Sequence, residues 1–173
     1  MMHIFKRLRS VSDVQTIRLE YIALCQSIIS YCGITWGAAC NTHLIKLERA
    51  QCALLKVAYH KLYRHPTESL YKEVDHLTVK QIYTSSAIQR FHKTSLSTIT
   101  PTLSNRRTVW SAPRVLTSFG KRNYNYVGPH LYTKLNKQLN IVSLTRGVCK
   151  RKVVSWLLTL NYNETERLLI TPT

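Results

Sequence analysis

Carboxylate side chains, which acid–base and metal chemistry require, are few in this sequence and missing from a long part of it. The 173 residues include 25 Lys and Arg against 8 Asp and Glu, a net charge of +17. The 88 positions between Asp75 and Glu164 hold fourteen Lys or Arg and no carboxylate. A magnesium site or a carboxylate general acid cannot be built from this stretch alone. Its unbalanced positive charge instead favours the phosphates of nucleic acid as a partner.

The remaining chemistry-bearing residues do not form a recognisable catalytic set. Asp13 and Asp75 are the only aspartates, and neither Glu20 nor Glu73 has the spacing to complete a metal bridge with them. The sequence has no Gly-rich phosphate loop, no Gly-x-Ser-x-Gly and no His-Glu-x-x-His. The histidines are scattered, and we interpret them as surface or helix-end residues. We therefore expect no catalytic residue, metal, cofactor or small-molecule substrate in this chain.

The cysteines and the N-terminus indicate an intracellular protein, in the nucleus or cytoplasm, that is not secreted. An odd number of cysteines without a Cys-x-x-Cys pair favours buried thiols in a reducing compartment: Cys25, Cys32, Cys40, Cys52 and Cys149. Residues 1–10 lack the apolar core of a signal peptide. Residues 21–39 are uncharged, but polar side chains interrupt them, so a buried helix is favoured there over a single membrane span.

Apolar residues at helical spacing predict a mainly α fold. The pattern over 13–36 covers well over half of a helix, which we expect to be the longest or the most buried of the bundle. A narrow row within it suits close approach by another backbone: Gln26, Ser30, Gly33 and Gly37. Four further helices are predicted: residues 42–59, 66–74 after Pro66, 78–97 behind a Thr78–Gln81 capping box, and 143–160 capped by Ser143.

The segments between these helices are less regular. Residues 95–111 are rich in Ser, Thr and Asn and predict a linker or an ordered loop. Residues 115–127 alternate weakly, which favours a short β-hairpin or an irregular strand pair. Gly128 and Pro129 then predict a stop, followed by one more short helix near Leu131 and Leu135.

Three groups of basic residues are candidates for contact with nucleic acid. Lys46, Arg49 and Lys56 share one face of the 42–59 helix, either as a row of phosphate contacts or as an ordinary solvated face. A second group lies on the last predicted helix: Lys150, Arg151 and Lys152.

The third basic group is interleaved with aromatic residues. In an extended conformation Arg122, Tyr124 and Tyr126 fall on one face, next to Lys121. The rings could stack on exposed bases while the cations hold phosphates. In the alternative interpretation, Phe119, Tyr124 and Tyr126 pack onto the helices and only the basic side chains are exposed.

Several segments, in this order, resemble one protein family. They are YIALCQSIISYCGITWG (21–37), LERAQCALLK (47–56), YRHPTESL (63–70) and FGKRNYNYVGPHLY (119–132). The chain is similar, over about residues 5–160, to the region downstream of the palm in reverse transcriptases of insect jockey-like non-LTR retrotransposons. The positions that carry the resemblance best are Tyr31, Gly33, Trp36, Gly37, Phe119, Gly120, Gly128 and Pro129.

This resemblance implies a helical thumb-like bundle and a basic tail that bind a template–primer duplex of RNA or DNA. The regions would be a thumb-like part (1–62), further helices (63–97), a linker or loop (98–112) and a basic C-terminal extension (113–173). Fingers and palm, with the aspartates that hold Mg²⁺, have no counterpart in the sequence. The resemblance thus indicates a truncated RNA-directed DNA polymerase that binds nucleic acid without catalysis.

A different class of function remains open from the sequence. The apolar 13–36 helix suits a host-adopted interaction module that docks a protein partner. That partner could be an intact reverse transcriptase whose palm accepts Tyr21, Leu24 and Ile28. A single-span membrane protein is the least favoured alternative.

Overall fold

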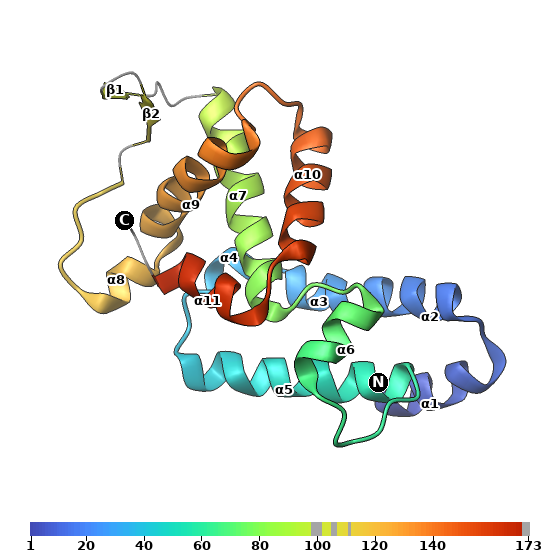
Figure 1. Cartoon of the computed structure of the whole chain (residues 1–173). Coiled ribbons are helices and arrows are strands. Elements are labelled where there is room, and N and C mark those ends of the chain that lie inside the picture. Colours follow the sequence, from blue (N-terminus) through green and yellow to red (C-terminus); the bar gives the residue numbers. More distant parts are fainter. Residues whose placement is uncertain (98–101, 105–106, 111, 171–173) are drawn as a thin grey trace.

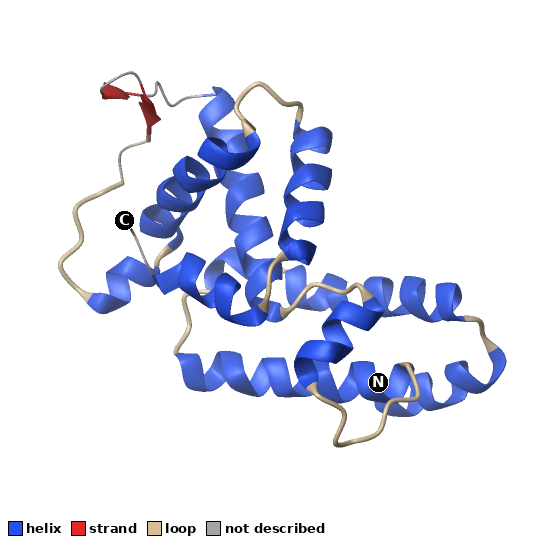
Figure 2. Ribbon diagram, viewed as in Figure 1, coloured by secondary structure: helices blue, strands red, loops and turns tan. Residues whose placement is uncertain are grey.

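The chain is mainly helical, as predicted, in a computed structural model that describes residues 1–97, 102–104, 107–110 and 112–170 (Figures 1 and 2). The helices of the first half are α1 (Met2–Val11), α2 (Val14–Tyr21), the π-helical turn η1 (Ile22–Gln26), α3 (Ser27–Ser30), α4 (Gly33–Trp36), α5 (Asn41–Ala58) and α6 (Thr67–Val74). Those that follow are α7 (Val79–Ser97), α8 (Ser118–Arg122), α9 (Tyr124–Leu139), α10 (Arg146–Thr159) and α11 (Tyr162–Ile170).

The described buried apolar residues form two clusters. The N-terminal cluster joins α1, α2, α5 and α6, and consists of Phe5, Ile17, Tyr21, Cys25, Cys52, Leu55, Ala58, Leu70 and Val74. The C-terminal cluster lies around α7, which packs against α9 on one side and α10 on the other (Figure 1). Its larger members are Ile82, Tyr83, Ile88, Phe91, Trp110, Leu131, Tyr132, Leu135, Ile141 and Leu157.

The central helix is α7, which with 19 residues is also the longest described one, so the prediction that residues 13–36 form the longest or the most buried helix is wrong. That segment is divided by η1 and ends at Tyr31, because Cys32 adopts a left-handed conformation with φ 51° before α4 begins. Only one side of it is covered. Leu24, Ile28 and Tyr31 are 36%, 59% and 76% exposed.

The predicted close approach along the row of small residues is present. A Cβ atom added to Gly37 would lie 1.9 Å from Cδ2 of Tyr83 on α7, and one added to Gly33 would lie 3.5 Å from the hydroxyl of Ser86. Only glycine at position 37 therefore lets α4 contact α7 at this distance. This contact joins the first half of the chain to the central helix.

Local sequence signals predicted the starts of two helices correctly. Pro66 is the N-cap of α6. At α7 the backbone N–H of Thr78 donates to Oε1 of Gln81 at 3.0 Å, and the N–H of Gln81 donates to the hydroxyl of Thr78 at 3.2 Å. These reciprocal bonds are a capping box, which satisfies two N–H groups that a helix leaves free.

The hairpin predicted within 115–127 is wrong. Residues 118–122 form α8 and residues from Tyr124 onward form α9. Thr117 caps α8 by accepting the N–H of Gly120, and Asn123 caps α9 by accepting that of Asn125. These caps favour helix over strand. The described strand pair lies earlier, in the predicted linker: β1 (Thr102–Ser104) and β2 (Arg107–Val109), antiparallel.

The stop predicted at Gly128 and Pro129 is also wrong, because both residues are buried inside α9. Pro129 is the sixth residue of that helix, so its missing N–H leaves only the carbonyl of the exposed Asn125 without a helical partner. A Cβ atom added to Gly128 would lie 3.0 Å from the ring of Tyr124 one turn earlier in α9, and in ordinary contact, at 3.4 Å, with the ring of Phe91 on α7.

The end of the chain differs from the prediction as well. The N-cap of α10 is Thr145, not Ser143, and a separate helix, α11, follows it. In Figure 1, α11 lies at the base of α7 and α10, above α5.

Candidate nucleic-acid interface

The predicted basic row on α5 is only partly available to a ligand. Lys46 and Arg49 are exposed. Lys56 is half-buried, and its Nζ donates to the carbonyl of Tyr63 at 2.7 Å and lies 5.9 Å from the centre of that ring. Arg49 and Lys56 line a groove of about 1110 Å³ that also involves α1, α6 and α11. The row therefore does not form one convex ridge of free cations.

The basic–aromatic segment lies on helices, not on a strand. Lys121 and Arg122 are exposed in α8. Tyr124 and Tyr126 are half-buried in α9 and pack against the C-terminal cluster, and burial raises the pKa of Tyr124. This favours the packing interpretation for both tyrosines. Phe119 does not fit the packing interpretation, because its side chain is 70% exposed.

The basic group on α10 is exposed. Lys150, Arg151 and Lys152 all face solvent, while Cys149, Val153 and Leu157 bury the opposite side of the helix. Lys152 has a structural contact, because its Nζ donates to the carbonyl of Leu139 at the end of α9 at 2.6 Å. Lys150 and Arg151 have no hydrogen bond or ion pair with another described residue.

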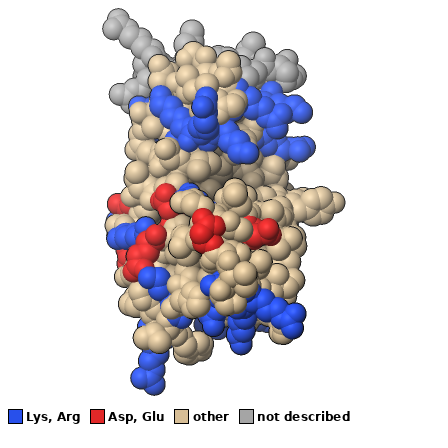
Figure 3. All heavy atoms as spheres, turned by 90° about the vertical axis from the view of Figure 1, so that its right-hand side faces the viewer, with Lys and Arg blue, Asp and Glu red and all other residues tan. Residues whose placement is uncertain are grey.

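Ion pairs hold several cations of the first half, and none of the described cations of α9 and α10. The Lys and Arg side chains of the ion pairs that join described residues come from residues 18–80: Arg18, Lys61, Lys72 and Lys80. Glu164 is used locally, since it accepts the N–H of Asn161 at 2.8 Å at the start of α11. Figure 3 shows a band of Asp and Glu that separates an upper group of Lys and Arg, at the height of α10, from a lower one.

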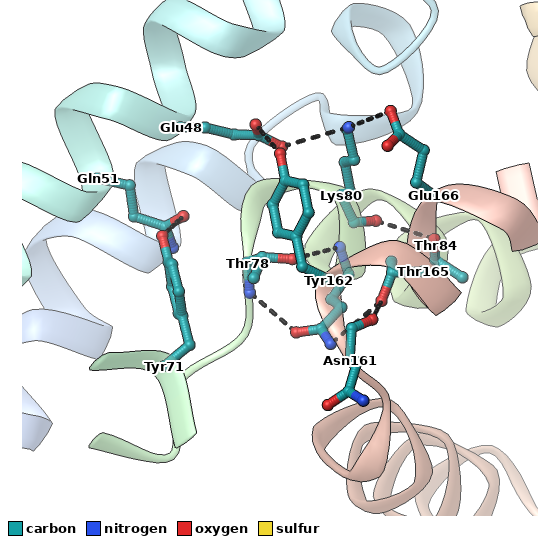
Figure 4. Close-up of polar contacts among 11 residues, drawn as sticks. Glu48, Gln51, Tyr71, Thr78, Lys80, Thr84, Asn161, Tyr162, Thr165 and Glu166 are labelled. Carbon is teal, nitrogen blue, oxygen red and sulfur yellow. Dashed lines mark hydrogen bonds and ion pairs between the residues drawn. The ribbon is translucent and has the colours of Figure 1, made fainter. Parts of the chain in front are cut away.

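A polar network that the sequence analysis missed lies where the two halves meet (Figure 4). Nζ of Lys80 lies 2.9 Å from Oε1 of Glu166 and 4.0 Å from Oε1 of Glu48, and the lysine side chain is 11% exposed. Tyr162 donates its hydroxyl to Oε2 of Glu48, and burial raises its pKa. Glu48, Lys80 and Glu166 stand far apart in the sequence, so no spacing rule could have found them.

Residues of α7 and α5 hold the surrounding elements in the same region. Nε2 of Gln81 donates to the carbonyl of Leu157 at 2.7 Å, which attaches the end of α10 to the first turn of α7. Nε2 of Gln51 donates to the hydroxyl of Tyr21 and to the carbonyl of Leu77, both at 2.8 Å. Tyr21 is therefore fully buried and cannot contact a partner, contrary to its predicted place in a docking face.

The two aspartates occupy helix ends. Asp13 caps α2, and hydrogen bonds from the Thr16 side chain and then from its backbone N–H lower the pKa of Asp13. Asp75 ends α6 in a left-handed conformation, and its Oδ2 lies 3.7 Å from the guanidinium of Arg18. Among the described residues, no three His, Cys, Asp or Glu side chains gather as metal ligands.

Some histidines and cysteines depart from their predicted positions. His76 and His92 are buried, not at the surface: His76 bonds the hydroxyl of Tyr59, and His92 bonds the hydroxyl of Tyr132 and the carbonyl of Leu144. Cys25, Cys52 and Cys149 are buried as expected, but Cys32 and Cys40 are exposed, and all five thiols are free.

No helix in the described part of the chain combines the length and the apolar character needed to cross a membrane. Comparison of the chain with protein-family models, with curated proteins and with solved structures finds no match.

Proposed function

We propose that this chain binds RNA or DNA through phosphate contacts and does not itself catalyse a reaction. In this proposal it corresponds to the thumb and tail of a truncated non-LTR retrotransposon reverse transcriptase, with its Mg²⁺-binding palm missing. Asp13 and Asp75 already serve as helix ends, and among the described residues no three His, Cys, Asp or Glu side chains gather as metal ligands.

The observation that carries the proposal is the set of exposed cations on α9 and α10 without a carboxylate partner among the described residues. Lys137, Arg146, Lys150 and Arg151 all face solvent. A folded protein gains little from such charge, which repels itself and costs stability. Phosphates of a nucleic-acid backbone would neutralise it and release bound counterions.

The main test is the salt dependence of binding to a duplex. If about six phosphates are contacted, the logarithm of the binding constant should fall against the logarithm of salt with a slope of roughly −4 to −6. Binding should differ little between sequences, because phosphate contacts carry no base information. A binding constant that does not change with salt would contradict the proposal.

A matched pair of variants locates the interface. Replacing Lys150 and Arg151 by Gln should weaken binding roughly 30-fold at about 0.1 M salt and make the slope less steep by about 1.5. Replacing Lys61 and Lys72 by Gln removes the same charge from cations already paired with Glu73 and Glu68, and should change binding far less. Equal losses in the two variants would place the interface elsewhere.

A second candidate function is protein docking through the outer side of η1 and α3. The exposed Leu24, Ile28 and Tyr31 favour it, because they form an apolar surface that nothing in the described chain covers. Replacing Leu24 and Ile28 by Ser should then abolish co-purification with an intact reverse transcriptase while duplex binding stays unchanged. Loss of duplex binding in this variant would argue against two separate surfaces.

A further inference from the structure

A pocket of about 230 Å³ lies where α4, α5, α7, α9 and α11 meet. Its apolar walls are formed by Trp36, Leu44, Val79, Tyr83, Val127 and Leu169. Two segments that the sequence analysis singled out separately meet here: Trp36 and Gly37 from the first half, and Arg122 from the segment around α8.

Tyr83 fixes these two segments relative to each other. Its ring packs at the position that a side chain on Gly37 would occupy, and its hydroxyl donates to the carbonyl of Arg122 at 3.3 Å. Trp36 donates its indole N–H to the carbonyl of Tyr31 at 3.1 Å. Its one polar atom is therefore already bonded, and its ring offers apolar surface to the pocket.

One side of the pocket favours an anion. Arg122 is exposed and has no carboxylate partner among the described residues. Asn41, which also lines the pocket, is the first residue of α5, and the N-cap residue Cys40 makes no side-chain cap. Hydrogen bonds from the backbone N–H and side chain of Thr42, and then the charge of Arg122, lower the pKa of the Cys40 thiol. The exposed guanidinium of Arg122 and the uncapped N-terminus of α5 therefore both favour a negative charge at this end of the pocket.

The other side offers a donor and an acceptor next to each other. Lys80 and Glu166 both line the pocket and are paired through Oε1 of the carboxylate at 2.9 Å (Figure 4). Oε2 of Glu166 has no hydrogen bond with another described residue. A ligand with N–H groups beside a carbonyl oxygen would donate to Oε2 and accept from Lys80.

We propose that this pocket binds a single nucleotide, with its base between Trp36 and Tyr83 and its phosphate at Arg122. The volume is below the range of pockets for drug-sized ligands, so it suits the base alone, with the sugar and phosphate outside it at the exposed Arg122. Identifying the ring as a nucleobase rests on the proposed function. Guanine fits best, because its edge places N–H donors beside the O6 acceptor. Free guanosine monophosphate and a 5′-phosphorylated guanosine at a strand end share this chemistry.

Calorimetric titration of the full chain with guanosine monophosphate tests the inference. Arg122→Gln should weaken binding about tenfold or more, since a charged hydrogen bond to phosphate is lost. Lys121→Gln removes the same charge from the adjacent position of α8, which does not line the pocket, and should change the dissociation constant less than about twofold. Ala39→Phe, which fills the pocket from its wall, should abolish binding without a change in the thermal melt.

Competition then identifies the source of the nucleotide. The competitor is a single-stranded oligonucleotide with a 5′-phosphorylated guanosine. If it displaces the monophosphate, the site binds strand ends. If it does not, the site binds the free nucleotide. Absence of heat at about 1 mM nucleotide, or equal effects of Arg122→Gln and Lys121→Gln, would overturn the inference. If duplex binding still depends on Lys150 and Arg151 in that case, the pocket is rejected and the proposed function stands.

Discussion

The region of α5 and α6 and the region of α9 and α10 carry similar cations on their outer sides but treat them differently. In the first region Lys61 and Lys72 pair with Glu73 and Glu68, and Lys56 bonds the loop that leads to α6. On α10, Lys150 and Arg151 have no such partner among the described residues. The charges of Lys56, Lys61 and Lys72 thus stabilise a loop and a helix turn, whereas those of Lys150 and Arg151 contribute little to the fold and are available to a ligand.

The boundary between the two regions is where charge is buried. Lys80 of α7 lies between Glu48 of α5 and Glu166 of α11, so one lysine connects carboxylates from both halves of the chain. Oε1 of Glu48 is buried and accepts no hydrogen bond from another described residue. The carboxylate depends on the nearby ammonium group, because an unpaired buried charge is costly.

The largest expected effect therefore follows from removing that lysine. Lys80→Met should lower the free energy of unfolding by about 3 kcal/mol or more, since it leaves Glu48 buried beside no cation. Urea unfolding measures it. Lys72→Met, which removes only an exposed pair on α6, should cost less than about 0.5 kcal/mol. Similar costs for both variants would mean that the buried pairing of Lys80 contributes no more to stability than the exposed pair of Lys72 and Glu68.

A companion variant separates charge from packing at this site. Adding Glu48→Gln to Lys80→Met removes the unpaired carboxylate and should recover part of the lost stability. No recovery would show that the lysine acts through its packing alone.

The second prediction concerns pH and the N-terminal region. His76 is 3% exposed, its ring lies 4.4 Å from that of Tyr21, and burial, followed by the charge of Arg18, lowers its pKa to about 4. Between pH 6.5 and 4 the unfolded chain therefore binds a proton that the folded chain does not. Stability should fall as pH falls through this window, by at most about 3 kcal/mol.

Unfolding measured at pH 7 and near pH 4.5 checks this sign. His76→Gln, which can still bond Tyr59, should reduce the pH dependence in this window. His3→Gln, at an exposed residue of α1, should leave it unchanged. A protein that becomes more stable on acidification through this window would show that His76 is not held neutral.

The features that the sequence could predict are those that depend on residues close together in the chain. The starts of α6 and α7 depend on Pro66 and on the pair Thr78 and Gln81, whose effects act within one turn. The exposure of Lys150 and Arg151 follows from the buried positions Cys149 before them and Val153 after them on the same helix. Such features need no knowledge of the rest of the fold.

The errors arise where distant packing or competing local bonds decide. The alternation at Arg122, Tyr124 and Tyr126 suited a strand, but the caps at Thr117 and Asn123 and burial against α7 make helices there. Residues 13–36 look central because their apolar stripe is wide, yet α7 takes that place. The pairing of Lys80 with Glu48 and Glu166 depends on how three helices meet, which periodicity does not record.

The smallest expected effects come from two glycines, one at a contact between the halves and one on the free surface of α10. Gly37→Ala would place a methyl group within 1.9 Å of the Tyr83 ring, so α4 or the ring must shift, at a cost of about 1–3 kcal/mol. Gly147→Ala meets no atom within 4 Å and lies in the first turn of α10, where alanine favours helix by up to about 1 kcal/mol. Thermal melts should therefore move in opposite directions, by roughly 2–4 °C per kcal/mol.

A double-mutant cycle tests whether the stability cost of Gly37→Ala comes from the contact with Tyr83. Tyr83→Leu loses the bond to the carbonyl of Arg122 and leaves more room opposite position 37. In that background Gly37→Ala should cost less than it does alone, because the clash is with the ring and not with the backbone of α7. An unchanged cost would place the strain in the turn after α4. A Gly37→Ala variant as stable as the parent would mean that α4 is not held against α7, and that the pocket between them is not fixed.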